Sequence, residues 1–205
     1  MAAKRPSDKH GRGACVDNKA RAFVYAFLSR LFEKELGTKE IEELRKNRDL
    51  LATIGEASRE YFAATDTATL QEALNIDYHS LFSVNSQPIE SIVVDATGEI
   101  LVGLQNPVMY FYFENGYEID MNRTEILAPD HLAIEFGFMQ NLAFRNEKRT
   151  ALRFLREHLL AWVPPYLCAI QEMAQTPFYR DVCDFTIEYL FRDFALLQEV
   201  GDDAV

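Results

Sequence analysis

The sequence predicts an all-α fold: a single compact domain of about eight or more helices with a long irregular crossing loop. Apolar side chains recur three or four residues apart along most of the 205-residue chain, which places them on one face of a helix. This periodicity is lost only across residues 83–105. Because the expected helices are short and that loop is long, we do not expect a simple up-and-down bundle.

The first part of the chain is expected to be helical. The first helix starts after Asp17, buries a face that includes Phe23, Phe27 and Leu31, and stops at Gly37. Aspartate is a common N-terminal cap, and glycine commonly ends helices. Further helical segments are expected at residues 38–54, 57–64 and 67–82.

Residues 83–105 are expected to form the crossing loop. The β-branched run from Ser91 to Val102 also allows a small hairpin that turns near Asp95–Gly98. Two short strands alone are marginally stable, so an irregular loop is favoured. A loop of this length inside a helical domain is often functional.

The second part of the chain is again expected to be helical, and prolines mark where its helices start. Asn106 combines a capping side chain with Pro107, which suits the first helical turn. Pro164 and Pro165 are expected to break one helix and start the next, because proline lacks the backbone N–H. The expected helices span residues 108–114, 129–145, 148–162, 165–173 and 177 onward.

Charge is distributed unevenly along the chain. Residues 1–21 hold six Lys or Arg and two Asp, whereas the remainder holds 15 Lys or Arg and 30 Asp or Glu. An acidic body repels nucleic acid phosphates and attracts basic partners. We interpret residues 1–16 as a disordered basic tail and residues 17–200 as the all-helical domain.

The tail has charge but no apolar segment of the kind found in secretory signals. No run in the chain approaches the roughly 18 consecutive apolar residues of a membrane span. We therefore expect a cytoplasmic protein that does not insert into membranes.

Sequence motifs for metal, nucleotide and nucleophilic sites are missing. His79, His131 and His158 fall on three separate expected helices, without an HExxH pattern, and the three cysteines form no CxxC pair. The glycines match no nucleotide-binding pattern, and no GxSxG motif is present. We expect no metal ligands, no cofactor and no catalytic residues.

The segment around residue 130 is the densest group of polar side chains at a helix start. Pro129 suits the first helical position, and Asp130 would lie near the positive end of the helix dipole. His131 and Glu135 are four residues apart, so they would meet on one face. The group could be an ordinary cap with a surface His131–Glu135 pair, or an acid–base dyad of His131 with Asp130 or Glu135.

Peptide binding is a further interpretation of this chain. An aromatic-rich helical body can leave a groove between helices, and an acidic rim can hold arginines through paired carboxylate contacts. Trp162, four residues after His158 and beside the two prolines, could lie in the core or at the lip of such a groove.

Four motifs in this order resemble one family. They are Tyr78-His-Ser-Leu-Phe82, Pro88-Ile-Glu90-Ser91, Pro129-Asp130-His131-Leu132 with Glu135, and Phe154-Leu-Arg-Glu-His158-Leu-Leu-Ala-Trp162 followed by Tyr166. Over residues 78–175 the chain resembles the all-helical chaperones for molybdenum-containing redox enzymes, of the TorD/DmsD/NarJ type. Where that family often carries aromatic residues around the Glu-Ser pair, this chain has Ile89 and Val93.

The resemblance implies a chaperone and not an enzyme. Such proteins bind the N-terminal signal region of a molybdopterin oxidoreductase subunit, which is often a twin-arginine signal. They also hold the apo form of that subunit until the cofactor is inserted and the subunit can be exported or assembled. The family's Asp-His pair carries over to Asp130 and His131. The residues expected to contact the peptide are Tyr78, Phe82, Glu90, Ser91, Asp130, His131, Glu135, His158 and Trp162.

Two other functions stay open at this point. One is a helical scaffold that joins subunits without specificity for a signal peptide. The other is a small acid–base enzyme that uses His131 and Asp130. The chaperone interpretation also allows either a monomer or a dimer that exchanges elements, with residues 83–105 as the hinge.

Overall fold

Helices form nearly all of the regular structure. The computed structural model describes residues 17–95, 98–119, 126 and 128–202, so the tail predicted at residues 1–16 lies outside the described residues. Within these ranges the only strand-like pairing is an isolated bridge between Ile89 and His131. The predicted all-α class is confirmed. Each described helix is too short or too polar to cross a lipid bilayer.

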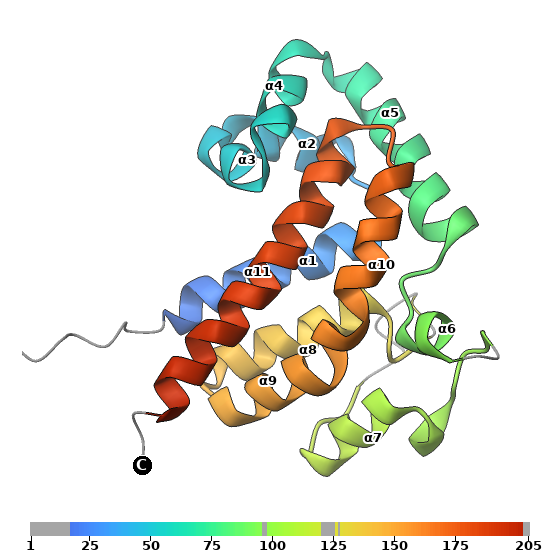
Figure 1. Ribbon diagram of the computed structural model, residues 1–205. Helices are drawn as coiled ribbons and strands as arrows, with labels where there is room; N and C mark the ends of the chain where they lie inside the picture. Colours follow the sequence, from blue (N-terminus) through green and yellow to red (C-terminus); the bar gives the residue numbers. More distant parts are fainter. Residues whose placement is uncertain (1–16, 96–97, 120–125, 127, 203–205) are drawn as a thin grey trace, which may run out of the picture.

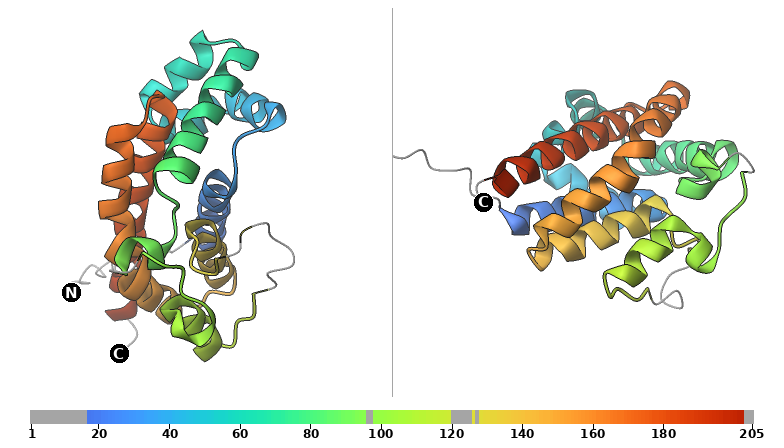
Figure 2. Two further views of the ribbon diagram at one scale, coloured as in Figure 1. Left: turned by 90° about the vertical axis from the view of Figure 1, so that its right-hand side faces the viewer. Right: turned by 60° about the horizontal axis from the view of Figure 1, so that its bottom comes forward.

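Two pairs of helices form the centre of the molecule. Helix α1 (Asn18–Glu33) packs along α8 (Leu132–Phe144), and α10 (Leu160–Met173) packs along α11 (Pro177–Asp202). The right-hand view of Figure 2 shows α10 and α11 as a layer over α1 and α8. The hydrophobic core lies between these layers.

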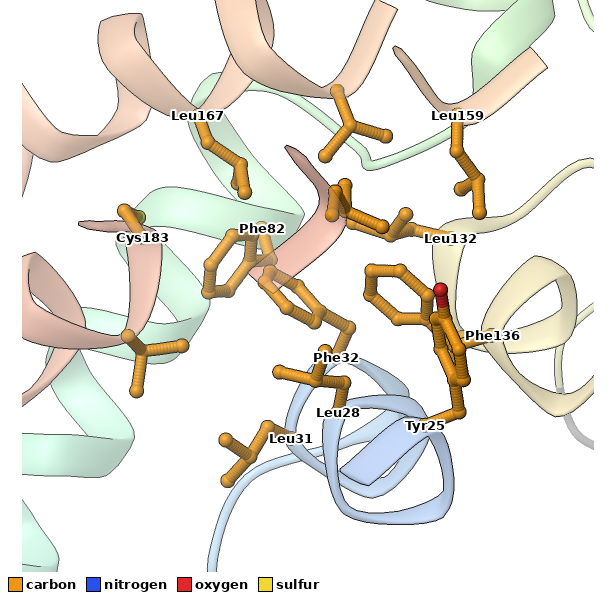
Figure 3. Close-up of a cluster of buried hydrophobic side chains, with 14 of the residues drawn as sticks. Tyr25, Leu28, Leu31, Phe32, Phe82, Leu132, Phe136, Leu159, Leu167 and Cys183 are labelled. Carbon is orange, nitrogen blue, oxygen red and sulfur yellow. The ribbon is translucent and has the colours of Figure 1, made fainter. Parts of the chain in front are cut away.

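Helix α1 begins at the predicted cap, where the Asp17 carboxylate accepts hydrogen bonds from two backbone N–H groups of the first turn. Its buried stripe includes Tyr25, Leu28 and Phe32, which face Phe136 of α8 (Figure 3). The prediction that Phe23 is a core residue is wrong, because its side chain is 63% exposed. The helix turns its Tyr25 stripe inward, and Phe23, two residues from Tyr25 and therefore about 200° around the helix, lies on the opposite face.

Four short helices follow at one end of the molecule: α2 (Thr38–Lys46), α3 (Arg48–Ile54), α4 (Glu56–Ala64) and α5 (Thr67–His79) (Figure 1). The single helix predicted over residues 38–54 is therefore two helices. Asn47 separates them, since its side-chain oxygen accepts a 3.1 Å hydrogen bond from the Leu50 N–H at the start of α3. Asparagine favours such capping geometry over the interior of a helix.

The other end contains the π-helical turn η1 (Ser80–Asn85), α6 (Glu90–Val94), the 3₁₀ turn η2 (Gly103–Gln105) and α7 (Pro107–Glu114) (Figure 1). Asn106 caps α7 and Pro107 opens it, as predicted. The hairpin considered for residues 91–102 is wrong, because its expected first strand is the helix α6. Residues 96–97, in the expected turn, lie outside the described residues.

Helix α9 (Lys148–Phe154), the π-helical turn η4 (Leu155–Leu159) and α10 follow one another directly. The break predicted at Pro164 and Pro165 is wrong, because both prolines lie inside α10. They follow the π-helical turn η4, and π-helix occurs mostly as such single turns within longer helices. Burial of the neighbouring Trp162 and Tyr166 then offsets the backbone hydrogen bonds that the prolines cannot make.

Gly55 caps α4 where that helix meets α11. The Asp181 carboxylate accepts hydrogen bonds from the Ser58 N–H and hydroxyl, each 2.7 Å long. A Cβ atom at Gly55 would overlap the Asp181 carboxyl group. We expect Gly55→Ala to lower the free energy of unfolding by about 1–3 kcal/mol, as overpacking does. Chemical denaturation followed by circular dichroism measures this.

Gly137→Ala is the matched control for that substitution. Gly137 lies inside α8, where a new Cβ would meet only the Ser29 hydroxyl at 3.8 Å. Alanine is the better helix former, so this change should add about 0.5–1 kcal/mol of stability. Equal effects of the two substitutions would contradict the close contact at Gly55.

Candidate functional site

Two segments distant in sequence meet beside the start of α8. The Glu90 N–H donates to the Asp130 carbonyl oxygen at 3.0 Å, and the Leu132 N–H donates to the Pro88 carbonyl oxygen at 2.8 Å. These bonds surround the bridge between Ile89 and His131. The structure thereby brings the Pro-Ile-Glu-Ser and Pro-Asp-His-Leu motifs side by side.

Asp130 stabilises a helix other than the one predicted. Helix α8 begins at Leu132, so Asp130 lies outside it and not in its first turn. Its Oδ2 accepts a 2.8 Å hydrogen bond from the Ser91 N–H at the start of α6. Its Oδ1 is buried and has no hydrogen-bond partner among the described residues. A buried carboxylate oxygen without a donor carries a desolvation cost that a cationic ligand would offset.

His131 is the N-terminal cap of α8, and its Nδ1 accepts a 3.2 Å hydrogen bond from the Ala133 N–H. Burial disfavours the charged ring and lowers the pKa of His131 to about 4, against the opposing effect of Asp130. The imidazole is therefore neutral at pH 7, with its proton on Nε2. The surface pair expected between His131 and Glu135 does not form, because Glu135 is fully buried.

The polar cluster continues into the core through Glu135, Glu90 and His158. Glu135 Oε2 lies 3.5 Å from the Trp162 Nε1–H, and its Oε1 has no partner within the described chain. Burial raises the pKa of Glu135 well above its usual range, and the negative charges of Glu90 and Asp130 raise it further. Glu90 in turn lies 3.1 Å from His158 Nδ1.

Two cavities lie at this place, and neighbouring residues of the bridge line different ones. The larger, of about 510 Å³, is lined by Ile89 and His131 with Tyr78 and Phe82. The smaller, of about 190 Å³, is lined by Glu90, Ser91 and Asp130. The Asp-His pair therefore serves two cavities.

The lining of these cavities includes residues that the sequence did not single out. Glu33 and Glu35 line the larger cavity, and Val94 and Leu101 line the smaller one. The two glutamates follow the apolar face of α1, and nothing in the local pattern separates them from ordinary surface acids. They add negative charge beside Tyr78, Phe82 and Ile89, and Lys34, which lines the same cavity, opposes it in part.

Three of the predicted contact residues lie in the core and line neither cavity. Trp162 is 1% exposed, so of the two places considered for it the core is the observed one. Glu135 and His158 are also buried. These side chains can act on a ligand only through the residues that they hold in place.

The geometry does not form an acid–base dyad. Asp130 binds the start of α6 and His131 binds the Ala133 N–H, so their side chains have different partners. The part of the chain that the structure describes also contains no group of three His, Cys, Asp or Glu that could hold a metal ion. What the arrangement offers is noncovalent recognition of a ligand that is both basic and apolar.

Comparison with known proteins gives matches over most of the chain. The family model of the nitrate reductase delta subunit matches residues 42–167. The chaperone protein TorD of Shewanella oneidensis is 26% identical to this chain over 211 residues, covering 92% of the chain and 95% of that protein. The TorD of Vibrio parahaemolyticus is 26% identical, covering 88% and 95%.

The matched residues span more than half of the chain and include every motif up to Tyr166 that carried the resemblance. The similarity to the TorD chaperones extends over nearly the full length of both proteins. The chain therefore belongs to the nitrate reductase delta subunit family, the TorD/NarJ type of redox-enzyme maturation chaperones, whose role is non-enzymatic.

Proposed function

We propose that this protein is a cytoplasmic chaperone that binds the N-terminal signal region, often a twin-arginine signal, of a molybdopterin oxidoreductase subunit. It holds the apo form of that subunit until the cofactor is inserted, and it prevents premature export or assembly. The family supports a chaperone of molybdoenzymes. The signal-reading role rests on the two cavities around Asp130 and His131.

The observation that carries the proposal is the unpartnered carboxylate oxygen of Asp130 at the smaller cavity. A guanidinium group supplies the donors that this oxygen lacks, and its charge is opposite. The apolar side chains Val94 and Leu101 in the same wall suit the methylene stem of an arginine.

The larger cavity would hold the residues that follow. Its wall combines Tyr78, Phe82 and Ile89 with two acidic residues and one basic residue, Glu33, Glu35 and Lys34. Apolar signal residues would gain burial there, while the acidic rim would attract the basic end of the peptide. The neutral His131 contributes an N–H donor and an aromatic face without adding a repelling charge.

Isothermal titration calorimetry with synthetic N-terminal peptides of the molybdopterin oxidoreductase subunits of the same organism tests this proposal. We expect Asp130→Asn to weaken binding roughly 10- to 100-fold, the value of a charge-assisted hydrogen bond. Asparagine keeps an oxygen that can accept the Ser91 N–H bond, so helix α6 stays capped. Melting temperature and circular dichroism should change little.

Control experiments distinguish specific recognition of the peptide by Asp130 from general attraction between a basic peptide and an acidic protein. Glu188→Gln removes one exposed acid of α11 outside both cavities and should leave the affinity unchanged. Replacing the paired arginines of the peptide by glutamine should abolish the difference between the protein and its Asp130→Asn variant. Equal binding of a client subunit with and without its N-terminal segment would instead indicate a scaffold without signal specificity.

A further inference from the structure

A third cavity, with a basic lining, lies among the short helices α2, α3 and α4, the group at the top of Figure 1. Its volume is about 340 Å³, and Arg45, Arg48 and Arg59 line it together with Leu51 and Phe62. None of these residues lines the cavities at Asp130 and His131. Three guanidinium groups around one cavity stand out in a chain whose formal charge is −11.

Arg45 is held in place by the protein itself. Its Nη1 donates to the Thr67 hydroxyl at 3.0 Å, and its Nη2 donates to the Thr65 carbonyl oxygen at 2.6 Å. Its Nε is buried and has no acceptor within the described ranges. A fixed guanidinium with an unused donor loses little conformational entropy when it binds an anion.

The surroundings strengthen the positive potential of the cavity. Leu51 and Phe62 are each 1% exposed and give the cavity apolar walls, which screen charge less than water does. Among the described residues neither Arg45 nor Arg48 has an acidic partner, whereas Arg59 pairs with Glu56. Glu60 also lines the cavity and opposes the three arginines in part.

We propose that this cavity binds a phosphoryl group, either free or as part of a larger ligand. Arg45 and Arg48 would contact its oxygens, since the planar guanidinium matches the geometry of phosphate in paired contacts. Arg59 would join them by exchanging its bond to Glu56. The site is independent of the signal-peptide role, because it lies in different helices.

Isothermal titration calorimetry of the full chain with inorganic pyrophosphate, at constant ionic strength set with chloride, tests the proposal. We expect saturable one-to-one binding that Arg48→Gln weakens at least roughly tenfold, as the loss of one charge-assisted bond would. Arg149→Gln removes an exposed arginine from α9 and is the matched control, with unchanged affinity expected. Glu60→Gln should tighten binding, because it removes the opposing carboxylate.

The possible outcomes distinguish a specific anion-binding site from nonspecific attraction of pyrophosphate to positive charge. Equal weakening by Arg48→Gln and Arg149→Gln, or no saturable heat at millimolar pyrophosphate, would overturn the proposal. If Arg48→Gln melts earlier than the parent protein, Arg59→Gln serves as the second variant. Tighter binding of adenosine diphosphate than of pyrophosphate would assign the phosphoryl group to a larger ligand, and equal binding would assign it to the free anion.

Discussion

Replacing Asp193 by alanine is expected to lower the free energy of unfolding by about 3–5 kcal/mol, the cost of leaving a buried charge unpaired. Asp193 lies on α11 and is 3% exposed, and its partner Arg21 on α1 is 5% exposed. Arg21 Nη2 donates to Asp193 Oδ2 at 2.9 Å, and the Tyr25 hydroxyl donates to the same oxygen at 2.7 Å. The substitution leaves the Arg21 guanidinium and the Tyr25 hydroxyl without this acceptor.

Urea unfolding of the parent protein and the variant measures this loss. The double replacement Arg21→Met with Asp193→Leu is the control, because it removes both charges and should recover most of the stability. Arg153→Ala removes an exposed arginine that contacts Glu114 and Glu157, and should cost at most about 1 kcal/mol. If the double replacement were as unstable as Asp193→Ala, the unpaired charge would not be the cause.

The N-termini of the helices show which features the sequence predicts and which it does not. Asp17 and Asn106 cap the helices that directly follow them, and both are visible as local patterns. At three other helices, a carboxylate from a distant segment accepts a hydrogen bond from a backbone N–H group at or beside the N-terminus. Asp181 binds the start of α4, Asp130 that of α6, and Asp77 that of α11, through the Thr176 N–H at 2.7 Å.

One of those distant contacts, that of Asp130 with α6, explains two errors of the prediction. Helix α6 has only five residues and its sequence is β-branched, so local propensity favours a strand there. The Asp130 carboxylate stabilises the helix instead, and no pattern within residues 83–105 contains that information. The same contact takes Asp130 out of α8, where the proline pattern had placed it. Tertiary contacts outweighed local preference at both positions.

The structure brings together several residues that the sequence singled out, in an arrangement that the sequence did not predict. The motifs identified the Glu90, Asp130 and His131 neighbourhood, and the backbone bridge brings these residues together. The separation of Asp130 and His131 into two cavities depends on their contacts with residues 88–91, and no local sequence pattern reveals those contacts. The acidic residues of the larger cavity, Glu33 and Glu35, come from the end of α1 and the segment after it, far away in sequence.

The buried carboxyl of Glu135 gives the last prediction. Its pKa is raised in the folded state by burial and by the neighbouring Glu90 and Asp130, whereas the unfolded chain has the ordinary value near 4.5. Below that value Glu135 is protonated in both states. As the pH rises above it, the unfolded chain releases the proton and the folded protein retains it, so Glu135 makes folding progressively less favourable up to the raised pKa.

Glu135→Gln removes this dependence, because glutamine is neutral at every pH and keeps an oxygen for the Trp162 N–H. The stability of the variant relative to the parent should therefore increase from pH 5 to pH 8, by up to about 1.4 kcal/mol for each pH unit below the raised pKa. Urea unfolding at the two pH values measures the difference, and Glu188→Gln, at an exposed position, should show none. An equal effect of Glu135→Gln at both pH values would mean that Glu135 is ionised in the folded protein.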